Sequence, residues 1–192
     1  MQPPATIILL NGISSAGKTS IARVLQATLD TPYLQVSLDA FEDMLPARYN
    51  ESGQFAWPAL FPALLRGFHR SIAALAGDGN SLIVDHVMVH RVGWMSTLAD
   101  CLDVLRPFPV HFVGVRCALD EAERRERARG DRQRGTAARQ FPLVHRHGLY
   151  DVEVDTTSAS PEACAARIRT AIAAHAPTAF ARLRQLPRAS IP

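Results

Sequence analysis

The sequence predicts an α/β fold in which a five-stranded parallel sheet carries helices on both faces. Short, continuous apolar runs recur along the chain, which is typical of strands buried on both faces. Stretches with apolar residues at helical spacing separate these runs, as in βαβ units. A loop that contains two glycines joins the first apolar run to the first helical stretch. With 192 residues, these features fit one domain.

Each element follows from its local pattern. The expected strands are the apolar runs 6–11, 33–38, 81–84, 110–115 and 152–155. The expected helices cover 19–29, 41–44, 60–76, 93–105, 119–129, 136–147 and 161–174, and residues 47–58 are expected to form a loop. We expect residues 1–176 to form the domain, with a small arginine-rich lid at about 129–147. Residues 177–192 are expected to be a C-terminal extension that packs loosely.

Composition and charge exclude several classes of protein. The net charge is +3, and nine arginines between Arg116 and Arg146 alternate with acidic residues, which is more typical of a solvated helix face than of a nucleic-acid site. No apolar run approaches the roughly 20 residues of a membrane span. Three widely spaced cysteines indicate reduced thiols in a cytoplasmic protein. We therefore expect neither a nucleic-acid nor a membrane partner, whereas a homo-oligomer stays possible.

The loop at Gly12–Thr19 (GISSAGKT) matches the phosphate-binding motif G-x-x-x-x-G-K-[ST] in full. It follows a predicted strand and opens a predicted helix, which is the context that the motif requires. The glycines let successive backbone N–H groups point at phosphate oxygens, and the helix N-terminus adds positive charge. The motif predicts a P-loop NTPase or kinase-like fold that binds ATP. The expected nucleotide-binding residues in this loop are Gly12, Ser14, Ser15, Ala16, Gly17, Lys18, Thr19 and Ser20.

Lys18 is the only lysine among 21 basic residues. A lysine ammonium is a compact charge on a flexible stem, which suits the β- and γ-phosphates better than the planar guanidinium of arginine does. The hydroxyl of Thr19 is expected to bind Mg²⁺. Since no second lysine exists, the guanine-reading box of GTPases, N/T-K-x-D, cannot occur elsewhere in the chain, which argues against a GTPase.

Two aspartates follow predicted strands, where ligands bind in open parallel sheets. Asp85 closes the apolar run 81–84 and is expected to hold Mg²⁺ together with Thr19. Asp39 follows the run 33–38 and is expected to accept the proton of a substrate hydroxyl that attacks the γ-phosphate. The alternative for both is a turn or cap role, and Asp39 could cap a helix that starts at Ala40.

Residues 129–135 form an arginine-rich loop with glycines at positions 130 and 135. We expect Arg129, Arg132 and Arg134 to belong to a lid whose guanidinium groups neutralise the transferring phosphoryl group. The spacing does not rank the three, and the alternative is a solvated loop.

Further candidates lie near the predicted strand ends. Apolar residues there could line an acceptor pocket, although core packing is the alternative for each of them: Phe41, Met44, Phe55, Trp57, Phe61, Val87 and Met88. The pairs His86 with His90 and His145 with His147 have no partner at zinc-like spacing. His86, beside Asp85, could instead orient the acceptor.

Five blocks, in order along residues 6–175, resemble the chloramphenicol phosphotransferase family. They are Asn11–Thr19, Val36–Asp39 with the following Met44–Pro46, Gly114–Cys117, Ala128–Arg132 and Tyr150–Thr157. The resemblance implies a P-loop kinase-like fold that uses ATP and Mg²⁺ to phosphorylate a hydroxyl of chloramphenicol. It also implies that Asp39 is the base, that Lys18 and Thr19 serve the nucleotide, and that Arg132 and Arg129 matter more than Arg134.

The chain departs from the family pattern in three places, one of which is the C-terminal extension 177–192. Its third strand ends in Asp85 followed by His86, where the family tends to carry a second aspartate. Residues 48–70, the expected acceptor wall, match poorly.

The combined prediction is an enzyme that transfers the γ-phosphate of ATP to a hydroxyl of a small molecule, with Lys18, Asp39 and Arg132 as catalytic residues. Two alternatives stay open, namely a nucleoside or nucleotide kinase and a non-catalytic nucleotide-binding switch.

Overall fold

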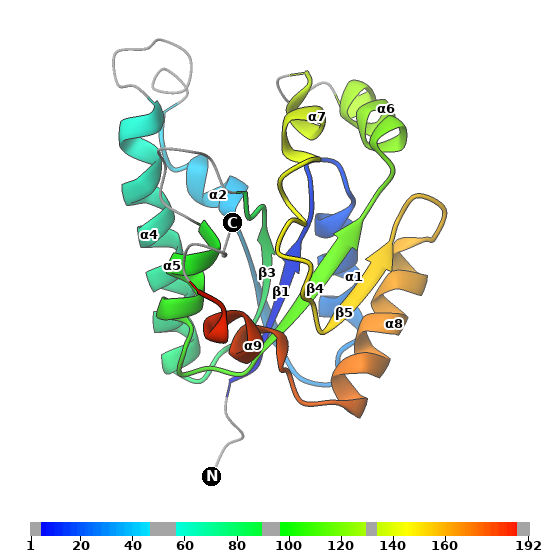
Figure 1. The fold of residues 1–192 in the computed structure, drawn as a ribbon. Helices are drawn as coiled ribbons and strands as arrows, with labels where there is room; N and C mark the ends of the chain where they lie inside the picture. The colour runs from blue at the N-terminus through cyan, green and yellow to red at the C-terminus, as the bar shows by residue number, and fades with distance from the viewer. Residues whose placement is uncertain (1–4, 47–56, 90–96, 130–133, 188–192) are drawn as a thin grey trace.

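Five parallel strands form the centre of the molecule, in the order β2–β3–β1–β4–β5 (Figure 1). The computed structural model describes residues 5–46, 57–89, 97–129 and 134–187. The strands are β1 (Ile7–Asn11), β2 (Tyr33–Ser37), β3 (Ser81–His86), β4 (Val110–Arg116) and β5 (Val152–Asp155). Every residue of the central strand β1 is buried, as its apolar sequence predicts. The predicted fold class is confirmed.

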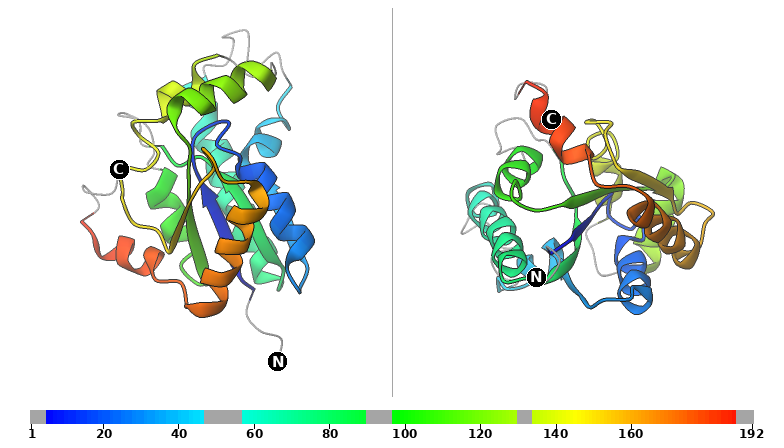
Figure 2. Two further views of the ribbon diagram at one scale, coloured as in Figure 1. Left: turned by 90° about the vertical axis from the view of Figure 1, so that its right-hand side faces the viewer. Right: turned by 90° about the horizontal axis from the view of Figure 1, so that it is seen from below.

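Helices cover both faces of the sheet (Figure 2). One face packs against α4 (Trp57–Gly77), α5 (Thr97–Val104) and α9 (Ala179–Gln185). The other packs against α1 (Lys18–Thr28) and α8 (Pro161–Ala174). Three shorter or more polar helices lie toward the carboxyl ends of the strands: α2 (Leu38–Glu42), α6 (Leu119–Arg129) and α7 (Thr136–Gln140).

The register of the central strands fixes the place of the site. β1 pairs with β3 so that Leu10 lies opposite Asp85 and Asn11 opposite His86. The phosphate loop starts where β1 ends, so the end of β3 lies directly beside it. Successive side chains of a strand point to opposite faces, which places Asp85 on the α1 side and His86 on the α4 side.

The predicted helix over 136–147 is too long. Helix α7 ends at Gln140, and residues 141–147 form turns. Pro142 has no N–H to continue the helical hydrogen bonds, although Phe141 before it still has helical dihedral angles (φ −50°, ψ −49°). Smaller boundary differences occur elsewhere: α4 begins at Trp57 rather than at 60, and α2 begins at Leu38, so that Asp39 lies in its first turn.

The expectation that the residues after Pro177 pack loosely is wrong for 178–187, the part of this segment that the structure describes. Helix α9 buries Phe180 and Leu183 in the core, and the Phe180 ring centroid lies 5.2 Å from that of Phe112 in β4. The Asp151 carboxylate accepts hydrogen bonds from the Thr178 and Ala179 backbone N–H groups at 2.7 and 2.9 Å. These contacts join α9 to the sheet, so the segment adds to the core.

Among the residues that the structure describes, no helix is both long and apolar enough to cross a bilayer. Cys101, Cys117 and Cys164 are buried free thiols.

Candidate active site

The phosphate loop needs its first glycine because β4 lies against it. A Cβ atom at Gly12 would lie 2.4 Å from the carbonyl oxygen of Val115, a distance that real Cβ contacts do not reach. At the other end of the loop, Gly17 has a φ of +84° and is the N-cap of α1. Ser15 also has a positive φ, of 62°. The backbone therefore curls in the way that a phosphate nest requires.

Replacing Gly12 with alanine should destabilise the protein by about 1–3 kcal/mol, the usual cost of overpacking, and weaken nucleotide binding, because the loop or β4 must move. Urea unfolding measures the first effect. Gly77→Ala is the matched control, since a Cβ atom at Gly77 would meet no atom of the described residues within 4 Å. Equal unfolding midpoints for the two variants would contradict this reading of the loop.

Lys18, Thr19 and Asp85 meet at the start of α1. The Lys18 ammonium donates to the carbonyl oxygen of Ile13 at 3.0 Å and lies 3.6 Å from Asp85 Oδ1. The Thr19 hydroxyl donates to Asp85 Oδ2 at 2.6 Å. Lys18 and Asp85 are each only 6% exposed, so the buried ammonium and carboxylate compensate each other. The structure thus brings together three residues that the sequence singled out.

The oxygen atoms of Thr19 and Asp85 are suitable ligands for Mg²⁺. The Thr19 hydroxyl and the Asp85 carboxylate are hard oxygen ligands, and Mg²⁺ is commonly held by one or two carboxylates together with substrate phosphates. Within the described residues, no group of three or more His, Cys, Asp or Glu side chains could hold a metal by itself. In the same loop, the hydroxyls of Ser14 and Ser15 are buried and have no hydrogen-bond partner among the residues that the structure describes. The loop therefore offers polar groups to a ligand.

A pocket of about 380 Å³ opens above the loop and gathers most of the predicted residues. Its lining consists of Ser14, Ser15, Gly17, Lys18, Thr19, Ser20, Asp39, Asp85, Arg124, Arg125, Ala128 and Arg129. Of the other predicted residues, Gly12 and Ala16 shape the loop backbone, whereas Arg132 lies outside the described residues. Arg134 is exposed and does not line the pocket.

Asp39 does not cap the helix that carries it. Ser37 is the N-cap of α2, and its hydroxyl accepts a hydrogen bond from the Ala40 N–H at 3.1 Å. The capping alternative for Asp39 is therefore wrong, and its side chain lines the pocket that Asp85 also lines.

Sequence reasoning missed Arg124 and Arg125, which line the pocket from α6. The mixed charges of this helix favour a solvated face, whereas the structure places these two arginines at the pocket. Glu121 accepts hydrogen bonds from Arg124 at 2.6 and 2.7 Å and from Arg125 at 2.7 Å, and these bonds lower the pKa of its carboxyl to about 2. The available signal was spacing: Arg125 precedes Arg129 by four residues and so shares its helix face.

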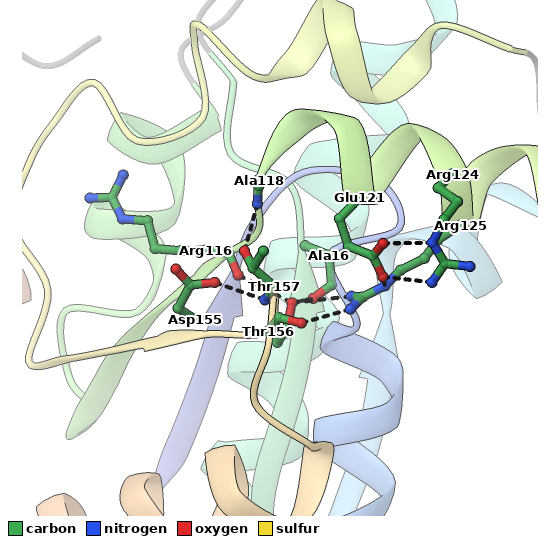
Figure 3. Close-up of polar contacts among 9 residues, drawn as sticks. All are labelled: Ala16, Arg116, Ala118, Glu121, Arg124, Arg125, Asp155, Thr156 and Thr157. Carbon is green, nitrogen blue, oxygen red and sulfur yellow. Dashed lines mark hydrogen bonds and ion pairs between the residues drawn. The ribbon is translucent and has the colours of Figure 1, made fainter.

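Thr156, just after β5, connects Arg125 to the phosphate loop (Figure 3). Its hydroxyl donates to the carbonyl oxygen of Ala16 at 2.8 Å and accepts from Arg125 Nη1 at 3.2 Å. Its own carbonyl oxygen accepts from Arg125 Nη2 at 2.6 Å. One arginine of α6 is therefore held in a fixed position beside the loop.

Asn11, the last residue of β1, fixes the segment that follows α7. Its amide nitrogen donates to the carbonyl oxygen of Val144 at 3.0 Å and to the Tyr150 hydroxyl at 2.8 Å. The Tyr150 hydroxyl lies 2.6 Å from Nδ1 of His145. Burial lowers the pKa of His145 to about 4, so its imidazole is neutral at neutral pH and forms this hydrogen bond in a neutral tautomer. Burial likewise lowers the pKa of His147 to about 4.

These histidines should make the protein sensitive to acid. An unfolded histidine has a pKa of about 6.5, so between pH 6.5 and 4 the unfolded chain takes up protons that the folded chain does not. The free energy of unfolding therefore falls as the pH is lowered through this window. We expect urea unfolding to show lower stability at pH 5 than at pH 7.5, with a smaller difference in a His145→Gln, His147→Gln double variant. His175→Gln, at an exposed position, is the control; an unchanged pH dependence in the double variant would contradict the prediction.

His86 faces away from the pocket. It is fully buried, its Nε2 lies 2.8 Å from Nε2 of His69, and His69 Nδ1 lies 2.5 Å from the Asp100 carboxylate. Burial and the neighbouring His69 lower the pKa of His86. The expectation that His86 orients the acceptor by contact is therefore wrong. His90 lies outside the described residues.

The apolar candidates separate into two groups. Phe41 and Met44 line an apolar groove of about 680 Å³ between α2, β2 and α4. Met88 is a core residue, and Phe61 and Val87 pack against the core clusters, as the core-packing alternative predicts. Phe55 and the side chain of Trp57 lie outside the described residues.

The fold and the site together define an enzyme of the P-loop kinase type. The phosphate loop follows the central strand of the parallel sheet, and α1 carries the lysine and the threonine of the motif. Strand β3 contributes a carboxylate, and α6 contributes arginines to the same pocket. Comparison with known proteins then gives the family. The model of the chloramphenicol phosphotransferase-like protein family matches residues 5–173, and the chain belongs to this family. The chain is accordingly a phosphotransferase.

Relatives and solved structures agree with this assignment. A protein found in two strains of Mycobacterium tuberculosis, provisionally named an O-phosphotransferase, is 32% identical over 205 residues, covering 95% of this chain and 89% of its own. The APS kinase of Mycobacterium tuberculosis (TM-score 0.67, 16% identity) and the tunicamycin resistance protein of Deinococcus radiodurans (0.64, 17%) each cover 90% of this chain and 99% of their own. At these identities the two structures show the shared fold.

Proposed function

We propose that the chain transfers the γ-phosphoryl group of ATP to a hydroxyl of a small molecule. The observation that carries this proposal is the arrangement of Lys18, Thr19 and Asp85, joined by contacts of 2.6 and 3.6 Å in the pocket that Asp39 also lines. The pocket therefore has a phosphate-binding side at the loop, and the Asp39 carboxylate is left to accept a proton from the acceptor hydroxyl.

On the donor side, the loop amides and Lys18 bind the β- and γ-phosphates. Thr19 and Asp85 would hold Mg²⁺, which neutralises negative charge on the phosphates when bound. Arg125, held by Thr156, and Arg129 present guanidinium groups to the same pocket and stabilise the charge of the transferring phosphoryl group. We propose the same role for Arg132 in the lid.

On the acceptor side, Asp39 accepts the proton of the acceptor hydroxyl as its oxygen attacks the γ-phosphorus. The bond between the γ-phosphorus and the bridging oxygen breaks, ADP leaves, and the product is a phosphate monoester. Asp39 then returns its proton to solvent.

The proposed acceptor is a hydroxylated antibiotic of the chloramphenicol type, and the family to which the chain belongs supports this choice. We propose that residues 1–176 form the catalytic domain, with a lid at about 129–147. The three buried free thiols are compatible with a reducing, cytoplasmic location.

The experiment measures ATP consumption across a panel of hydroxylated antibiotics and nucleosides, with product mass as the readout. Each acceptor is paired with an analogue that lacks its reactive hydroxyl. We expect a phosphorylated product from a hydroxylated antibiotic and none from its analogue. A product from nucleosides alone would identify a nucleoside kinase, whereas nucleotide binding with no turnover of any acceptor would contradict the proposal and support a switch.

A further inference from the structure

A side chain from α7 bonds to the phosphate loop. Gln140 is the last residue of α7, and its carbonyl oxygen Oε1 accepts a hydrogen bond from the backbone N–H of Ser14 at 2.6 Å. Ser14 belongs to the loop and lines the 380 Å³ pocket. The neutral side-chain amide oxygen of Gln140 thus occupies the Ser14 N–H, a backbone donor of the kind that phosphate loops direct at phosphate oxygens.

The groups around this hydrogen bond indicate that a phosphate oxygen can replace the Gln140 oxygen. The side-chain hydroxyls of Ser14 and Ser15 are buried and have no hydrogen-bond partner among the described residues. Buried polar groups in proteins rarely lack a hydrogen-bond partner, so these two hydroxyls indicate that the loop binds a polar group. A phosphate oxygen is charged, and hydrogen bonds to ionised acceptors are roughly twice as strong as neutral ones. Phosphate should therefore displace the Gln140 oxygen from the Ser14 N–H.

Two anchors hold Gln140 in place. Before it, the buried Glu126 carboxylate of α6 accepts from the backbone N–H groups of Gly135 and Ala137 at 2.7 and 3.0 Å, which fixes α7 to α6. After it, the Val144 carbonyl oxygen accepts from the side chain of Asn11. Helices α6 and α7 thus hold the Gln140 oxygen at the loop, and α6 is also the helix that carries the pocket arginines.

We propose that Gln140 competes with phosphate for the Ser14 amide and so sets the affinity of the enzyme for its phosphate donor. The proposal rests on the proposed function for the identity of that donor. Gln140 is a positioning residue: it lowers the affinity of the loop for phosphate and takes no part in the chemical step.

The test compares Gln140→Ala and Gln140→Glu with the wild-type protein. Calorimetry measures binding of tripolyphosphate and of a non-hydrolysable ATP analogue. Without the competing oxygen, Gln140→Ala should bind both ligands about twofold to tenfold more tightly, which is the net worth of one hydrogen bond. A carboxylate at position 140 holds the amide more strongly and repels phosphate, so Gln140→Glu should bind about tenfold more weakly or worse.

Matched controls exist on α1. Gln26 bonds to the Tyr33 carbonyl oxygen at an exposed position away from the pocket, so Gln26→Ala and Gln26→Glu should bind both ligands as the wild-type protein does. Thermal unfolding of every variant confirms that the proteins are folded. In turnover, Gln140→Ala should lower KM for ATP and leave kcat unchanged, because removing the competitor favours the ground state and the transition state equally.

The sign of the effect decides the outcome. If Gln140→Ala binds tripolyphosphate equally well or more weakly, Gln140 supports the loop and the proposal is overturned, whatever the turnover. If the wild-type protein phosphorylates no acceptor but the two variants shift tripolyphosphate affinity in opposite directions, the competition stands and the proposed function fails. A wild-type protein that binds neither tripolyphosphate nor the ATP analogue overturns both.

Discussion

Lys18→Arg should lower kcat by at least about 100-fold, the effect of removing one well-placed charge donor from a transition state. Lys18 is 6% exposed, and its ammonium lies 3.0 Å from the Ile13 carbonyl oxygen and 3.6 Å from Asp85 Oδ1. A planar guanidinium is larger and cannot make both contacts from the same stem. Initial rates at saturating ATP and acceptor measure the effect.

The reverse exchange on the same helix is the control for this variant. Arg23 lies on the exposed face of α1, and Arg23→Lys should keep wild-type turnover. Both variants should unfold cooperatively, because each keeps its positive charge. Near-normal turnover in Lys18→Arg would mean that the only lysine of the chain has no special part in phosphoryl transfer.

Asp39→Asn should retain nucleotide binding and lose turnover by about 100- to 10,000-fold, the usual contribution of a general base. Asparagine has nearly the shape of aspartate but cannot accept the proton of the acceptor hydroxyl. Asp39 lines the pocket from the first turn of α2. Rates at saturating substrates, together with the Kd of an ATP analogue, separate chemistry from binding.

Asp43→Asn is the matched control, because Asp43 follows the same helix as its C-cap and does not line the pocket. We expect it to turn over at the wild-type rate. If Asp39→Asn instead binds the ATP analogue poorly and turns over bound substrate normally, Asp39 belongs to the nucleotide site and not to the acceptor side.

The fold was predictable because its signals are local. The apolar run of β1 followed by GISSAGKT sets a strand, a loop and a helix within one stretch of sequence. The family blocks were also recognisable one at a time. The short apolar run 81–84 likewise predicts from local sequence that Asp85 lies near the end of a strand, and the pairing of β1 with β3 brings it to Thr19.

The errors lie where distant parts of the chain decide the outcome. Gln140 and Ser14 are 126 residues apart, so no spacing rule indicates their hydrogen bond. Arg125 belongs to the pocket because Thr156 holds it, and the charge pattern of α6 alone suggested solvent. Helix α9 is stabilised by Phe112 on a distant strand, although Phe180 and Leu183 do stand at helical spacing.

If the enzyme is a phosphotransferase of the proposed kind, the γ-phosphoryl group of ATP is transferred to the hydroxyl of an acceptor. The most direct measurement uses ATP labelled with ¹⁸O in its γ-phosphate, and mass spectrometry of the acceptor found in the panel. We expect an acceptor monoester that carries the labelled phosphate, formed together with ADP and lost in Asp39→Asn. Labelled inorganic phosphate with an unmodified acceptor would contradict it.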